Sequence, residues 1–91
     1  MRRIERTTAF RRDFRREQQG RHRNLDKAVA DIVQMLATDT PLPERNRDHA
    51  LSGNWSGYRE CHVRPDLLLI YEKAEGVLRL IRLGSHSELF R

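Results

Sequence analysis

Residues 58–83 read YRECHVRPDLLLIYEKAEGVLRLIRL, and this stretch decides the fold. The blocks Leu67–Tyr71 and Val77–Leu83 are apolar and rich in residues that strands favour, and a third predicted strand covers Tyr58–Val63. A Pro-Asp pair suits a tight corner between the first two strands, and Lys73–Gly76 suits a hairpin turn between the last two. We therefore predict three consecutive antiparallel strands.

Two helices are predicted before these strands. Thr7 or Thr8 can cap a helix over about residues 8–19, and Asn24 suits the start of a second helix. The apolar residues of the second helix recur at helical spacing and form one stripe: Leu25, Ala28, Val29, Ile32, Val33 and Leu36. A short first strand, Arg2–Thr7, precedes both helices.

The predicted order of elements is therefore β-α-α-β-β-β. This order is typical of an α+β fold in which two N-terminal helices pack on one face of a small antiparallel sheet. With 91 residues, the chain is expected to form a single domain, residues 1–91. Only loops and the C-terminal segment remain to cover the opposite face, so we expect a concave, polar site there.

Positive charge is concentrated at the N-terminus. Residues 1–23 contain nine arginines and three acidic residues, whereas residues 24–91 contain nine basic and ten acidic residues. Arginine binds phosphate through a planar fork of donors, so this pattern favours a nucleic-acid partner. The arginines predicted to contact RNA lie on the first helix: Arg11, Arg12, Arg15 and Arg16. A solvated helix face is the alternative explanation of the same charges.

Cysteine usage and hydropathy exclude several classes of protein. Cys61 is the only cysteine, so the chain can form no internal disulfide and has no CxxC metal or redox motif. The N-terminus lacks the apolar core of a signal peptide, and no apolar run approaches the length that spans a membrane. We expect a soluble, cytoplasmic protein with no membrane partner.

Three histidines and an aspartate lie at or near the ends of the predicted strands: His49, His62, Asp66 and His86. Imidazole changes its charge near neutral pH, so such a cluster suits general acid–base catalysis. RNA cleavage by internal transfer needs a base for the ribose 2′-OH, an acid for the 5′-oxygen and positive charge for the phosphorane. Arg59, Arg64 and Arg82 are candidates for that charge. The reaction requires no metal and no other cofactor.

Each of these residues also has a structural interpretation. His49 could be a solvated loop residue, His62 a cross-strand partner of an acid, and His86 a cap of the final turn. The four could instead ligate zinc, but the close spacing of structural zinc sites is absent, and we predict no metal. Strand pairing alone does not guarantee that His86 meets Asp66, so sheet twist and the length of the closing segment are expected to bring them together. His22 is expected to be an exposed contact or a bystander.

Two aromatic residues could serve either in packing of the protein or in recognition of a base. Trp55 is expected to close the edge of the core, with stacking on a base as the alternative. Phe90, beside His86 at the C-terminus, could stack on a nucleobase or could anchor the C-terminal tail.

The segment from His49 to Tyr71 resembles the YafQ-like branch of the RelE/ParE toxin superfamily. It carries the pattern H-x-L-x-G-x-W-x-G-Y-R-x-x-H-V-x-P-D, and the chain ends with the related pattern G-[ST]-H-x-x-L-F. The resemblance extends over nearly the whole chain. It implies a toxin of a bacterial toxin–antitoxin pair, an endoribonuclease that enters the ribosomal A site and cuts the mRNA there.

The resemblance also implies roles for individual residues. The catalytic residues of the family correspond to His49, His62, Asp66 and His86, and its supporting arginine and terminal aromatic residue correspond to Arg82 and Phe90. We expect His86 to be the general acid, Asp66 with His49 to form the base side, and His62 to stabilise the phosphate. Some relatives have a tryptophan where this chain has Leu67, so no stacking is expected there.

The implied partners are the ribosome, mRNA and a cognate antitoxin with an acidic, partly disordered segment that folds on binding. Two alternatives remain. One is a ParE-like toxin of the same fold that inhibits DNA gyrase without cleaving RNA, although that branch does not need the histidine set. The other is an RNA-binding module without catalytic activity.

Overall fold

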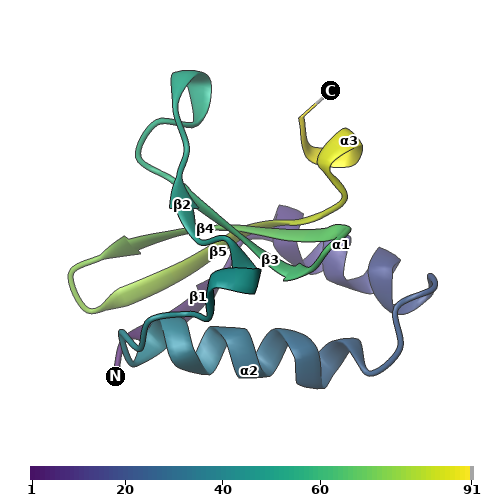
Figure 1. Cartoon of the computed structure of the whole chain (residues 1–91), viewed down its shortest axis with the longest axis horizontal. Coiled ribbons are helices and arrows are strands. Elements are labelled where there is room, and N and C mark those ends of the chain that lie inside the picture. The colour runs from purple at the N-terminus through teal and green to yellow at the C-terminus, as the bar shows by residue number, and fades with distance from the viewer. Residues whose placement is uncertain (91) are drawn as a thin grey trace.

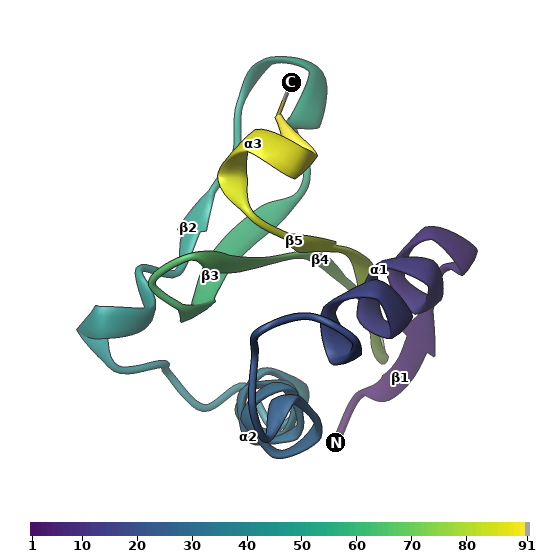
Figure 2. The ribbon, with the colours of Figure 1, turned by 90° about the vertical axis from the view of Figure 1, so that its right-hand side faces the viewer.

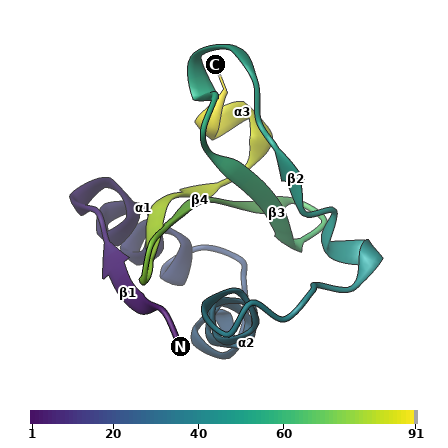
Figure 3. The same cartoon turned by 90° about the vertical axis from the view of Figure 1, so that its left-hand side faces the viewer.

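The computed structural model describes residues 1–90 and shows α-helices on both faces of a five-stranded sheet (Figure 1). The elements are β1 Arg3–Arg6, α1 Thr8–Gln18, α2 Leu25–Ala37, the 3₁₀ turn η1 Glu44–Asn46, β2 His49–Ala50, the 3₁₀ turn η2 Gly53–Trp55, β3 Arg59–Arg64, β4 Leu67–Ala74, β5 Val77–Gly84 and α3 His86–Leu89. Helices α1 and α2 lie on one side of the sheet, whereas η2 and α3 rise from the other side (Figures 1 and 3).

The strand order in the sheet is β1-β5-β4-β3-β2. Strands β3, β4 and β5 pair antiparallel, as predicted, and the short β2 adds a further antiparallel edge. Strand β1 pairs parallel to β5, so the sheet is mixed rather than wholly antiparallel. Strands joined by a tight turn run antiparallel, whereas the two helices that follow β1 permit a parallel return. The predicted α+β class with two helices on one face is confirmed.

The face of the sheet toward α1 and α2 holds the larger apolar core. The apolar stripe of α2 is buried there, as its spacing predicts, and Leu36 is 1 % exposed. The stripe packs in one cluster with alternate residues of β4 and with residues of β5: Leu67, Leu69, Tyr71, Leu78, Leu80 and Leu83. Figure 2 shows α2 end-on beneath the sheet.

A smaller apolar cluster covers part of the opposite face. The intervening β4 residues Leu68 and Ile70 project to this side and are buried, so β4 is covered on both faces. Their cover consists of Leu89 of α3 and the half-buried rings of Trp55, Tyr58 and Phe90, among others. Because these covering segments are short, polar side chains share the rest of the face.

Asp13 of α1 fills a gap at the edge of the sheet. Strand β1 pairs with β5 only as far as Leu80, and beyond it the Leu83 N–H donates to Asp13 Oδ2 at 3.0 Å. Arg82 Nε donates to the same oxygen at 2.6 Å, and Arg16 donates to Asp13 Oδ1 at 3.1 Å. Burial alone would raise the pKa of Asp13, but the hydrogen bonds from Arg82 and the Leu83 N–H outweigh it and hold the pKa below its ordinary value of 3.8.

The two predicted N-caps behave differently. Thr7 Oγ1 accepts the Phe10 N–H at 3.0 Å, which confirms the cap of α1. Asn24 directly precedes α2, as predicted, but its side chain makes no capping hydrogen bond. The backbone of Asn24 has a φ of 53°, a left-handed conformation that asparagine adopts more readily than most residues. Asn24 therefore contributes the turn into α2 rather than a cap.

The Asp13 contacts predict a large loss of stability in Asp13→Asn. This change leaves Arg82 without its buried counter-charge and should lower the free energy of unfolding by ~3 kcal/mol, measured by urea denaturation. The matched control is Asp31→Asn, which removes an exposed partner of Lys27 in α2 and should cost only ~0.3 kcal/mol. Equal losses of unfolding free energy in the two variants would show that Asp13 contributes no more to stability than an exposed carboxylate.

The same carboxylate predicts a pH dependence. Because the native pKa of Asp13 lies below the unfolded value of 3.8, its contribution is fully present above that pH. The contribution is lost as the pH falls through the lower native pKa. Unfolding measured across this acidic range should therefore show a steeper loss of stability in the wild-type protein than in Asp13→Asn.

Candidate functional site

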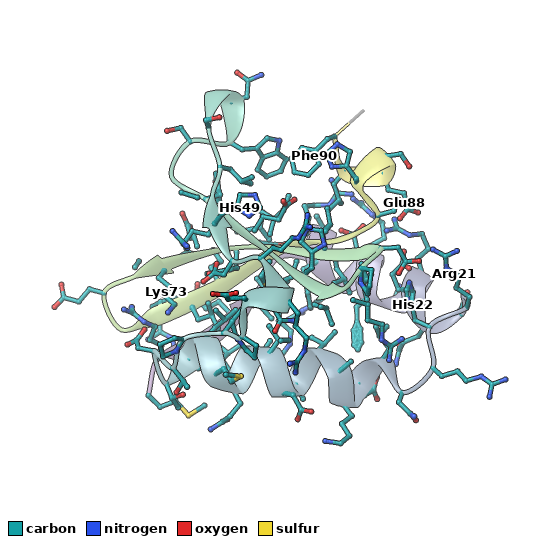
Figure 4. The ribbon with its side chains drawn as sticks, viewed as in Figure 1. Arg21, His22, His49, Lys73, Glu88 and Phe90 are labelled. Atoms are coloured by element: carbon teal, nitrogen blue, oxygen red, sulfur yellow. The ribbon has the colours of Figure 1, made fainter. Side chains whose placement is uncertain are left out.

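His49 and His62 lie on the face of the sheet that is opposite α2. In the strand register His49 pairs with Glu60, Glu60 with Ile70, and His62 with Leu68. Leu68 and Ile70 belong to the apolar cluster of this face, and residues two apart on a strand share a face. Figure 4 shows His49 on this side of the sheet. Two predicted catalytic imidazoles and a carboxylate therefore occupy one surface.

The strand register also brings His86 to the same end of the sheet as His62. Strand β5 returns antiparallel to β4, so that Gly84 pairs with Leu68, which pairs with His62. His86 follows Gly84 by two residues as the first residue of α3. The end of β5 lies beside the start of β4, so strand pairing brings the segment that carries His86 to the end of the sheet where Asp66 lies.

The ring of His49 contacts two hydrogen-bond acceptors. Nδ1 lies 2.6 Å from the carbonyl oxygen of Arg47, and Nε2 lies 3.1 Å from Glu60 Oε2. Glu60 is only 6 % exposed, and its second oxygen, Oε1, has no hydrogen-bond partner among residues 1–90. About half of the His49 side chain, 49 %, is exposed. His49 therefore connects a buried carboxylate to the surface of the site.

Within residues 1–90, the ring of His62 has a hydrogen-bond partner at one nitrogen only. Its Nδ1 lies 3.3 Å from the carbonyl oxygen of Pro65. A carbonyl can only accept, so Nδ1 carries the hydrogen and Nε2 is the acceptor of the neutral ring. The backbone of the same residue is fixed by Asn46, whose Nδ2 donates to the His62 carbonyl oxygen at 2.7 Å. His62 thus contacts the turn rather than an acid across the strands.

Asp66 occupies the turn between β3 and β4, where it forms an ion pair with Arg21 from the loop after α1. Its side chain is 47 % exposed. Asp66 also lines a polar depression of about 420 Å³ together with Ser85, Ser87 and Glu88 at the start of α3. The carboxylate is therefore near the segment that carries His86, but it is already paired with a cation.

Aromatic rings form a wall above this face. Trp55 packs edge-to-face on Tyr58 at 5.6 Å and on Phe90 at 5.9 Å between ring centroids. The ring of His86 lies 5.0 Å from that of Phe90. The expected packing of Trp55 is confirmed, and the half-buried ring of Phe90 packs against it. Through Phe90 the wall also orients the His86 imidazole.

Two of the arginines predicted to bind substrate have structural partners. Arg82 binds Asp13 through Nε at 2.6 Å and through a second nitrogen at 3.2 Å. Arg59 pairs with Tyr71, which faces the α2 side, and its Nε lies 3.3 Å from both Asp48 Oδ1 and the Tyr71 hydroxyl. Arg59 is therefore separated by the sheet from the imidazoles, which argues against its predicted contact with substrate.

Arg64 and His22 stabilise the connection between α1 and α2. Arg64 donates to the carbonyl oxygen of Arg23, and its other terminal nitrogen lies 3.3 Å from His22 Nδ1. The side chain of His22 is 7 % exposed, with Nε2 3.7 Å from Glu17. The expectation of an exposed His22 is wrong, because the loop folds this ring against β3. The position of Arg64 likewise argues against its predicted role in binding substrate.

The basic residues of α1 divide into two groups. Arg11, Arg12 and Arg15 are exposed and form no ion pair within residues 1–90. Arg11 and Arg15 border an apolar groove of about 610 Å³ between α1 and α2. Arg16 instead binds Asp13 and, at 3.5 Å, Glu88 of α3. Only the first three retain free positive charge for a polyanion.

The sequence analysis missed Glu60 as part of the site. Glu60 and His62 are two residues apart in a predicted strand, so their shared face could have been inferred. The contact with His49 could not, because it depends on the pairing of the short β2, which no sequence pattern indicates. Asp13 was also missed, since its arginine partner lies 69 residues away.

Other reactive groups lie apart from this face. Cys61 is buried on the α2 side, and burial raises the pKa of its thiol to about 12, which makes it a poor nucleophile. Within the described residues no three His, Cys, Asp or Glu side chains cluster as the ligands of a metal ion would. Nor is any helix in residues 1–90 both long and apolar enough to cross a membrane.

The geometry agrees with a known family. Residues 2–91 match the family model described as the bacterial toxin of the type II toxin–antitoxin system, YafQ. The chain belongs to the YafQ toxin family. Among its curated relatives, the mRNA interferase toxin YafQ of Escherichia coli strain B / BL21-DE3 is 37 % identical over 87 residues, which cover 96 % of this chain and 94 % of that protein.

Solved structures of YafQ proteins have the same fold. The crystal structure of YafQ from E. coli BL21(DE3) has a TM-score of 0.89 at 36 % identity, with 100 % of both chains covered. The YafQ chain in the crystal structure of the E. coli DinJ–YafQ complex has a TM-score of 0.87 at 36 % identity, again with 100 % of both chains covered.

The capping of α3 predicts how His86 is held in this YafQ-family chain. Ser85 Oγ accepts the Glu88 N–H at 3.2 Å, and Glu88 Oε1 accepts the Ser85 N–H at 2.8 Å. Ser85→Ala should destabilise α3 by ~1 kcal/mol and speed hydrogen exchange of the Leu89 and Phe90 amides about five-fold. Amides of β4 serve as the internal control. Unchanged exchange in α3 would show that the capping box does not hold this helix.

Proposed function

We propose that this chain is the toxin of a type II toxin–antitoxin pair and that it cuts mRNA in the ribosomal A site. The YafQ family and the two curated E. coli relatives that are named mRNA interferase toxins support the reaction class. The observation that carries the proposal is the shared sheet face of His49 and His62, with His86 at the same end of the sheet beneath an aromatic wall. This is an acid–base surface of nucleotide-binding character.

The proposed reaction needs only groups of this face and the RNA. The 2′-oxygen attacks phosphorus as its proton passes to a base, and the bond from phosphorus to the 5′-oxygen breaks as His86 protonates that oxygen. A 2′,3′-cyclic phosphate and a free 5′-hydroxyl result. Asp66 is already paired with Arg21, whereas His62 Nε2 has no partner within residues 1–90. The contacts therefore favour His62 over Asp66 as the base.

Partners and location follow from this function. The proposed antitoxin presents an acidic segment, which suits the net charge of +5 and the unpaired arginines of α1. The E. coli DinJ–YafQ complexes support a protein antitoxin. The proposed substrate, mRNA on translating ribosomes, places the toxin in the cytoplasm. Residues 1–91 form the single toxin domain of this proposal.

His86→Ala should abolish most of the mRNA cleavage. Loss of the general acid is expected to lower the rate ~10²–10⁴-fold on translating ribosomes, measured by primer extension along an mRNA. Asp31→Asn is the control, because this exposed carboxylate lies on α2, on the other side of the sheet from the site. Cleavage by His86→Ala at the wild-type rate would show that His86 takes no part in the reaction. If the wild-type protein inhibited DNA supercoiling and cut no RNA, it would instead be a gyrase inhibitor.

Ribosome binding should depend on salt through the unpaired arginines of α1. In the combined variant Arg11→Gln, Arg12→Gln, Arg15→Gln, the slope of log affinity against log salt should fall by ~0.7–0.9 for each phosphate contact that is lost. Arg79→Gln is the control, because Glu5 and Glu72 already neutralise this arginine. A slope that is equal in the two variants would leave α1 without a role in RNA binding.

A further inference from the structure

Glu60 is a buried carboxylate in need of a cation. It lies between His49 and the apolar Ile70 in the strand register and is 6 % exposed. An ionised carboxylate at such a position is strongly unfavourable unless a positive group pairs with it. Within residues 1–90 the positive group in contact with Glu60 is the His49 ring, with Nε2 at 3.1 Å from Oε2.

The two polar contacts of His49, a hydrogen bond at Nδ1 and an ion-pair contact at Nε2, favour a proton on each ring nitrogen. Nδ1 faces the Arg47 carbonyl oxygen at 2.6 Å, and a carbonyl can only accept. Nε2 faces a carboxylate oxygen, which also accepts when it is ionised. An imidazole with two acceptors is satisfied as the imidazolium, or as a neutral ring only if Glu60 itself carries the proton.

The proton is better placed on the imidazole than on Glu60. An imidazole binds a proton more tightly than a carboxylate does, by roughly two pKa units in short peptides. The neutral alternative carries the proton on Glu60 Oε2, the oxygen that faces His49 Nε2, and Glu60 is only 6 % exposed. The exposed half of the His49 ring, in contrast, keeps part of its charge in contact with water.

We propose that Glu60 is a positioning residue that pairs with His49 as an imidazolium, so that His49 supplies positive charge to the phosphorane rather than acting as the base. The inference rests on the proposed ribonuclease function and changes the expected role of His49. With a proton on both ring nitrogens, His49 has no lone pair that could accept the 2′-OH proton. His62, whose Nε2 is unpartnered within residues 1–90, retains such a lone pair.

Nitrogen NMR of the free protein tests the ion pair without any activity. In wild-type protein near neutral pH, both ring nitrogens of His49 should show the signals of a protonated ring. In Glu60→Gln the signals should change to those of a neutral ring with distinct protonated and unprotonated nitrogens. Glu72→Gln is the matched control, since it removes a carboxylate that pairs with Arg79 on the neighbouring strands, and should leave His49 unchanged.

Cleavage kinetics test the role of the charge. Glu60→Gln should lower kcat on the order of 10²-fold with little change in KM, because the positive charge acts on the transition state. Glu72→Gln should cleave at the wild-type rate. A neutral His49 ring in the wild-type protein would overturn the proposal even if Glu60→Gln does not fold, and so would unchanged kcat in Glu60→Gln.

The two readouts separate this inference from the function on which it rests. Wild-type protein that cuts no mRNA on ribosomes would contradict the ribonuclease proposal, whereas the NMR signals would still report the state of His49. An active enzyme with a neutral His49 would contradict only the part assigned to Glu60.

Discussion

The buried carboxylate of Asp13 holds together the parts of the structure on which the site depends. Strand β1 covers the edge of β5 only to Leu80, and beyond it the polar backbone of β5 would lack partners. Asp13 accepts the Leu83 N–H, and Arg16 donates to the Leu83 carbonyl oxygen at 3.1 Å, so that α1 replaces the missing strand. The end of β5 is thereby fixed against α1, and α3 begins directly after it.

The two faces of the sheet serve different purposes because they are covered to different extents. Helices α1 and α2 cover one face with a continuous apolar core. On the other face, short segments bring an aromatic wall of Trp55, Tyr58 and Phe90 over only part of the surface. Polar groups can therefore share that surface with apolar ones. Apolar side chains exclude water from part of this face, and imidazoles lie at its margin. Because the dielectric constant is lower where water is excluded, each charge acts more strongly on a bound phosphate.

His49 and His62 differ in the proton transfers they can perform, because fixed acceptors contact their ring nitrogens differently. The Arg47 carbonyl and Glu60 contact the two ring nitrogens of His49, whereas the ring of His62 has a partner only at Nδ1 in the described part of the chain. The arginines likewise differ in whether an acidic side chain pairs with them. Arg82 is held by a buried carboxylate, whereas Arg12 of α1 remains exposed without an ion pair in the described residues. Residue type alone is thus a weak guide to role in a chain with so many charged groups.

The sequence by itself determined the features that depend on local periodicity and on recurring motifs. These are the apolar stripe of α2, the doubly buried β4, the helix face of the sheet, and the set of histidines that marks the family. Only the tertiary structure decided the parallel pairing of β1, the pairing of His49 with Glu60, and the partners of Arg59 and Arg82. The reason is physical: periodicity reports which face of an element is buried, whereas ion pairs and strand pairing join residues far apart in the chain, where any of several carboxylates could have served the same cation.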